Sequence, residues 1–137
     1  DKVHLICSEK YYAKDQISIE ELKTQQLIML VEKFSYQRLL KKALKRQGEE
    51  LSSFKVLMNL DSTESVKASV IAGLGFAFLP YMAIKKELYL KQLRMVELPK
   101  IEIEYDLYMI HKETDGYGDV PLEIVHYFEE IVEETFC

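Results

Sequence analysis

The stretch that decides the fold lies near the middle of the chain. It reads Asp61-Ser62-Thr63-Glu64-Ser65-Val66-Lys67 and, after five intervening residues, Gly73-Leu74-Gly75-Phe76-Ala77-Phe78-Leu79-Pro80. The first part predicts a helix capped by Asp61 or Ser62, and the glycine at its end is a helix stop. The second part predicts a short buried strand followed by a proline that starts another helix. The inward face of the first helix is expected to carry Val66, Val70 and Ile71.

Strands and helices alternate along the rest of the chain. Short apolar runs predict strands at 3–7, 27–31, 54–58, 76–79 and 105–110, with a weak edge strand at 95–98. Helices are expected from Ser18, from Ser35 to Gly48, from Ser62, from Pro80 to about Leu90, and over 121–135. Ser18 and Glu21 form a capping box with Ile17 and Leu22 as a hydrophobic staple, and Ser35 is expected to be an N-cap. The fold class is therefore α/β, with a mainly parallel sheet flanked by helices.

Composition limits the class of protein. The chain has 137 residues, of which 48% are apolar and 30% charged, as expected for one globular domain. No apolar run approaches the roughly 20 residues of a membrane span, and no signal peptide is evident. The two cysteines, Cys7 and Cys137, lie at opposite ends and form no disulfide framework. These features predict a cytoplasmic protein without membrane association.

Charge argues against direct binding of nucleic acid by most of this chain. The formal net charge is −5, whereas binding to phosphates requires a basic surface. One helix is locally basic, with Arg38, Lys41, Lys42, Lys45 and Arg46. A solvated face opposite Leu39, Leu40, Ala43 and Leu44 is favoured over a nucleic-acid or partner patch.

The ordered segments resemble the effector-binding domain of LysR-type transcriptional regulators. The resemblance rests on Ser18-Ile19-Glu20-Glu21-Leu22, Ser35-Tyr36-Gln37-Arg38, Gly48, the segment 72–80, and Asp106-Leu107-Tyr108-Met109-Ile110-His111-Lys112. It implies a sensor module in a DNA-binding regulator, with two α/β lobes of the type II periplasmic-binding-protein kind. A solute-binding lobe of a transport system is the alternative, and an enzyme is not expected.

The resemblance also predicts how the chain is organised. The segments that match the family include neither a helix-turn-helix nor the first lobe, so we expect a single truncated effector-binding domain over 1–137. Residues 8–103 would form the second lobe, 1–7 and 104–111 the crossover strands, and 112–137 a segment that normally packs on the first lobe. The apolar face of helix 121–135 is therefore expected to dock on the chain's own sheet or to form a homo-oligomer, and DNA to be bound only through the absent N-terminal domain.

The candidate ligand contacts lie at helix N-termini. Unpaired N–H groups there favour a carboxylate, sulfate or phosphate, which predicts a small anionic metabolite as effector. The candidates are Ser35, Tyr36, Ser62, Thr63, Phe34 and Phe78. By resemblance, Ser35 matches a position where family members contact their effector. For the hydroxyl residues the alternative is a purely capping role, and for the two phenylalanines it is core packing.

Other chemical motifs are weaker. Gly73 and Gly75 follow a helix and precede a strand, the reverse of a phosphate-binding glycine loop. Cys7 is expected to be an inert core thiol rather than a redox sensor. His4 and His111 are a conceivable metal or pH-sensing pair, but two histidines without further ligands predict no metal site, and no cofactor is expected.

Overall fold

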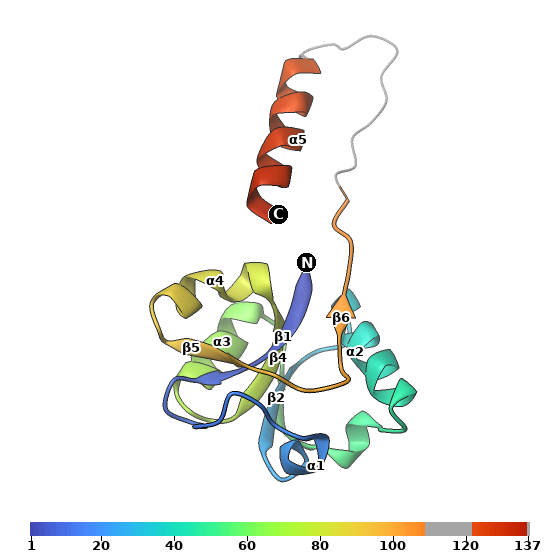
Figure 1. The fold of residues 1–137 in the computed structure, drawn as a ribbon, viewed down its shortest axis with the longest axis vertical. Coiled ribbons are helices and arrows are strands. Elements are labelled where there is room, and N and C mark those ends of the chain that lie inside the picture. Colours follow the sequence, from blue (N-terminus) through green and yellow to red (C-terminus); the bar gives the residue numbers. More distant parts are fainter. Residues whose placement is uncertain (109–121, 137) are drawn as a thin grey trace. The chain divides into compact units, whose positions relative to one another are not determined.

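The computed structural model describes residues 1–108 and 122–136, which fall into two compact units, Asp1–Tyr105 and Asp106–Cys137 (Figure 1). In the second unit, helix α5 (Leu122–Phe136) is described for its backbone and for part of its side chains. Within these described ranges, no helix has the length and apolar character needed to cross a membrane.

The first unit is built on a mixed six-stranded sheet. Its strands are β1 (Lys2–Ser8), β2 (Gln26–Leu30), β3 (Lys55–Leu60), β4 (Phe76–Pro80), β5 (Leu93–Val96) and β6 (Ile103–Glu104). The order is β3-β2-β4-β1-β5, and β6 also pairs with β1. β2 is parallel to β3 and β4, whereas β1 is antiparallel to β4, β5 and β6. All strands except β1 therefore point the same way, and β1 runs in the opposite direction between β4 and β5. The predicted α/β class is confirmed.

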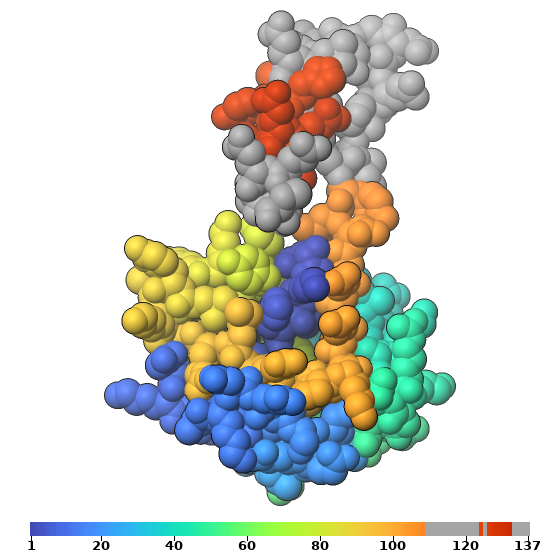
Figure 2. Space-filling model, in the orientation of Figure 1, coloured from blue at the N-terminus to red at the C-terminus, as the bar shows by residue number. Residues whose placement is uncertain are grey.

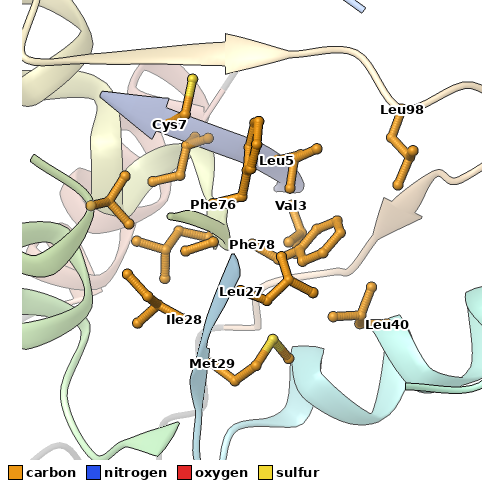
Figure 3. Packing of buried hydrophobic residues seen from close by; sticks show 14 of the residues in the cluster. Val3, Leu5, Cys7, Leu27, Ile28, Met29, Leu40, Phe76, Phe78 and Leu98 are labelled. Carbon is orange, nitrogen blue, oxygen red and sulfur yellow. The ribbon is translucent and has the colours of Figure 1, made fainter. Parts of the chain in front are cut away.

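Helices cover both faces of this sheet. They are α1 (Ile19–Leu22), α2 (Ser35–Arg46), a 3-10 turn (Leu51–Ser53), α3 (Thr63–Ile71) and α4 (Tyr81–Tyr89). Along β2, Leu27 and Met29 point toward the side of Leu40 on α2, and Ile28 points away from it (Figure 3). α3 packs against β1, β2 and β4. Both faces of the central strands are thus buried, which explains why β4 and most of β2 are continuous apolar runs.

The sequence predicted most of the helix ends correctly. Ser18 and Ser62 are N-caps, and their hydroxyl oxygens accept hydrogen bonds from the amides of Glu21 and Ser65, both at 3.1 Å. Gly73 follows the C-cap of α3 with φ of 80°, a left-handed conformation that favours glycine. The prediction for Ser35 was wrong. The N-cap of α2 is Phe34, and Ser35 is the first helical residue.

Two other predictions need correction. The strand expected at 105–110 is absent from 105–108, and 109–110 lie outside the described residues. β6 is instead Ile103–Glu104, which pairs with Val3 and Lys2 of β1. Ile71 is 38% exposed, so the inward face of α3 consists of Val66 and Val70 without it.

The solvated basic surface of α2 was anticipated, whereas the apolar face expected on α5 is not tested. Arg38, Lys41, Lys42, Lys45 and Arg46 are exposed, while Leu40 and Leu44 are buried, which agrees with a solvated face. In α5 the side chains of Ile124, Tyr127, Phe128 and Ile131 are at least 37% exposed. Docking or oligomerisation through this helix remains a prediction. His111 and Pro121 lie outside the described residues.

Candidate functional site

Three helices begin at one edge of the sheet. β2, β3 and β4 point the same way, and each is followed within a few residues by the first turn of α2, α3 or α4. The carboxyl edge of parallel strands is where open α/β sheets bind ligands, and helix N-termini add N–H donors and partial positive charge. β1 starts at this edge as well, because Val3 pairs with Pro80. The candidate site is the set of first turns at this edge.

Tyr36 is the most informative residue of the site. Its side chain is 6% exposed, and its hydroxyl has no hydrogen-bond partner among the described residues. Burial raises the pKa of the phenol well above its ordinary value; nearby Tyr105 adds to this rise, and the side chain of Thr63 opposes it. Thr63 is thus close to the hydroxyl but completes no hydrogen bond of good geometry with it. Buried polar groups are nearly always paired, so this hydroxyl beside the start of α3 lacks the partner that such a group usually has.

The neighbours of Tyr36 on α2 are arranged around the first turn. Ser35 is exposed, and no side chain caps this helix. Phe34 is partly buried, with its ring centroid 6.0 Å from that of Tyr36, and the ammonium of Lys33 lies 5.4 Å from the Phe34 ring centroid. The first turn of α2 therefore has free N–H groups, an accessible hydroxyl and an adjacent cation.

The first turn of α3 is only partly available. The Ser62 hydroxyl caps Ser65 through its amide and also donates to the Ser65 hydroxyl at 2.7 Å. This side chain is already satisfied by its structural role, as the capping alternative anticipated. Thr63 is half-buried and lies close to Tyr36. The geometry thus brings together Tyr36 and Thr63 from two helices.

Asp1 and Tyr105 complete this edge, and sequence reasoning missed both. An oxygen of the Asp1 carboxylate accepts hydrogen bonds from the Met82 amide and from the Tyr105 hydroxyl, each at 3.2 Å. The backbones of Asp1 and Tyr105 are also paired, with N–O distances of 2.8 and 3.0 Å. No local motif marks these contacts, because they join residues 81 and 104 positions apart.

Phe78 is not part of this group of side chains. It is 4% exposed and lies among the core residues between β1, β2 and α2 (Figure 3). It also lines a hollow of about 220 Å³ beside β1, together with Lys2, His4 and the segment 96–103. Burial, and then the charge of Lys2, lowers the pKa of His4. In the described part of the chain no cluster of metal-binding side chains is found.

Two further buried groups lie outside the candidate site. Lys67 is 8% exposed and pairs with Glu64 on its own helix and with Glu87 on α4, at 2.8 and 3.0 Å. Burial alone would lower the pKa of Lys67, but the bonds to the two carboxylates outweigh it and the net shift is upward. Cys7 is fully buried, and burial raises its pKa to about 11. Such a thiol is unreactive at neutral pH, in agreement with the inert-core prediction.

Comparison with known families places this architecture. The family model described as LysR substrate binding domain matches residues 1–116. The chain belongs to the LysR substrate-binding domain family. Among its relatives, the probable RuBisCO transcriptional regulator of Cyanidium caldarium is 36% identical over 94 residues, covering 69% of this chain and 30% of that protein. The corresponding protein of Thalassiosira pseudonana is 32% identical over 114 residues, covering 80% and 37%.

Solved LysR regulatory domains share the fold. The regulatory domain of CcmR from Synechocystis PCC6803, in complex with 2-PG, superposes with a TM-score of 0.67 at 16% identity, covering 98% of this chain and 62% of that chain. The apo regulatory domain of HypT from Salmonella typhimurium gives 0.59 at 22% identity, covering 74% and 47%. The chain spans between 30% and 37% of the length of the two curated relatives named above. All these relatives are regulators or their regulatory domains, and they give no support to the solute-binding alternative.

Proposed function

We propose that this LysR-family domain is the effector-binding part of a transcriptional regulator and that its effector is a small anionic metabolite. The anion binds at the first turns of α2 and α3, contacting Ser35, Tyr36 and Thr63. Ser62 supports the site mainly as the cap of α3. Phe34 borders it.

The observation that carries this proposal is the unpaired, buried hydroxyl of Tyr36. A hydroxyl in this state costs folding free energy, and the cost is recovered when a ligand accepts its hydrogen bond. The surrounding N–H groups of two helix N-termini favour an anion over a neutral molecule. Lys33 adds a positive charge beside the Phe34 ring, 5.4 Å from its centroid.

The mechanism follows from the family architecture. The ligand binds between this lobe and a second lobe, and it has different affinities for two interlobe arrangements. Its binding therefore shifts a pre-existing equilibrium between them. The regulator binds DNA through a separate N-terminal domain and acts in the cytoplasm as a homo-oligomer. The names of its relatives, which are transcriptional regulators, support a regulatory rather than a catalytic role.

The test uses the complete regulator that carries this chain. Binding of 2-PG, the molecule held by the CcmR regulatory domain, is measured by calorimetry for the native protein and for Ser35→Ala and Tyr36→Phe variants. Each variant is expected to weaken binding at least several-fold with little effect on folding, since one charge-assisted hydrogen bond contributes about 1.5–3 kcal/mol. A matched control is Ser52→Ala, an exposed serine in the 3-10 turn. Unchanged binding in both site variants, with binding detected in the native protein, would contradict the assigned site.

A further inference from the structure

The three helix N-termini at the sheet edge are chemically different. The first turn of α4 already holds an anion, because the Asp1 carboxylate accepts the Met82 amide at 3.2 Å. The same carboxylate oxygen accepts the Tyr105 hydroxyl at 3.2 Å. The Asp1 and Tyr105 backbones are also hydrogen-bonded to each other, which holds the carboxylate in place. This arrangement lies wholly within the first compact unit.

At the first turns of α2 and α3, no carboxylate of the described residues accepts a backbone amide: Glu64, in the first turn of α3, is exposed and pairs with Lys67 at 2.8 Å instead. α2 has no side-chain cap, and Ser62 caps α3 with a neutral hydroxyl. Between them lies the Tyr36 hydroxyl, more than nine-tenths buried and without a partner in the described structure. A ligand anion approaching this edge therefore finds free donors at α2 and α3, and a carboxylate at α4.

We propose that Asp1 is a specificity-determining residue whose carboxylate occupies the start of α4 and confines anionic ligands to the first turns of α2 and α3. The inference rests on the proposed function of these two turns. A carboxylate at a helix N-terminus is stabilised by the helix dipole, and it repels a second anion at the same place. The Tyr105 hydroxyl donates a hydrogen bond to the Asp1 carboxylate. Tyr105 is also close to Tyr36, so it lies between the first turn of α4, which the carboxylate occupies, and the first turn of α2.

The surface view agrees with this division. Figure 2 shows the N-terminal residues, in blue, at the surface between the yellow-green start of α4 and the orange residues of β6. Removing the Asp1 carboxylate would therefore leave two donors, the Met82 amide and the Tyr105 hydroxyl, near the surface. A small anion with several acceptor oxygens matches this pair of donors.

The experiment is a titration of the isotopically labelled 137-residue protein with inorganic phosphate at neutral pH, followed by amide NMR. The native protein is compared with Asp1→Ala and with Asp1→Asn, which preserves the shape but removes the charge. Tyr105→Phe is the matched control, since it removes one hydrogen bond but leaves the carboxylate on Met82. We expect a saturable phosphate-dependent shift of the Met82 amide in Asp1→Ala, a weaker one in Asp1→Asn, and none in the native protein or in Tyr105→Phe.

Two results would overturn the inference. One is a saturable Met82 shift in the native protein, which would mean that the carboxylate does not exclude anions. The other is a flat Met82 response in a folded Asp1→Ala or Asp1→Asn variant, which would mean that no anion site is being blocked. The amides of Tyr36 and Thr63 report separately on the proposed ligand site. Their behaviour in the native protein distinguishes failure of that site from failure of the Asp1 inference.

Discussion

Replacing Tyr36 with phenylalanine should stabilise the ligand-free protein, the reverse of what removal of a buried tyrosine hydroxyl usually does. The ring is 6% exposed and stays in place, while the hydroxyl that is removed has no partner. Burying an unpaired hydroxyl costs about 1–3 kcal/mol, so Tyr36→Phe should raise the free energy of unfolding by about 1 kcal/mol. For a chain of this size the melting temperature should rise by about 3 °C.

The assay is urea unfolding followed by circular dichroism, with Tyr105→Phe as the matched control. The Tyr105 hydroxyl donates to the Asp1 carboxylate, so its removal should lower the free energy of unfolding by about 1 kcal/mol. The same chemical change at two tyrosines of one edge should thus have opposite signs, with unchanged denaturant slopes. Equal destabilisation by both variants would show that the Tyr36 hydroxyl is paired within the protein, and the argument for a ligand donor would fail.

Other predictions concern the buried charge, the glycines and the thiol. Lys67→Met should lower the free energy of unfolding by about 3 kcal/mol at pH 7, because it leaves Glu87 buried without its cation. The loss should shrink at acidic pH, where Glu87 is protonated. An equal loss at both pH values would contradict this. Gly75→Ala should lower the melting temperature more than Gly48→Ala, because a Cβ at position 75 would lie 2.5 Å from a backbone oxygen of β2. A Cβ at position 48 would meet nothing within 4 Å, and only the left-handed φ of 74° would be strained. Equal losses would refute the clash. Burial raises the pKa of Cys7 from 9.0 to about 11, so its contribution to stability is present below pH 9 and is lost, by about 2–3 kcal/mol, as the pH rises toward 11. Cys7→Ala should therefore reduce the fall in the free energy of unfolding between these pH values. An unchanged fall would exclude the thiol as its source.

Local patterns predicted the elements whose signals are local. Ser18, Ser62 and Gly73 occupy the predicted positions because caps and stops depend on a few neighbouring backbone groups. The buried strands were equally visible, since both faces of β2 and β4 are covered and their residues are nearly all apolar.

The edge of the sheet was harder to predict because its contacts are distant in sequence. The strand expected at 105–110 was placed from its apolar run alone, whereas the pairing with β1 falls on Ile103 and Glu104. The hydrogen bond from the Met82 amide to the Asp1 carboxylate joins residues 81 positions apart, and no local sequence pattern in either segment predicts it. The candidate residues at α2 and α3 were named from helix starts alone, whereas the burial of Tyr36 and its lack of a partner became evident only in the fold.

We propose that the Tyr36 hydroxyl, at the first turns of α2 and α3, donates to the effector. Its most direct test is a crystal structure of the regulator with 2-PG bound. We expect an anionic oxygen of the ligand about 2.5–3.0 Å from the Tyr36 hydroxyl, with further contacts to the first turn of α2. A ligand bound elsewhere, such as the hollow beside β1, with the Tyr36 hydroxyl still unpaired, would contradict it.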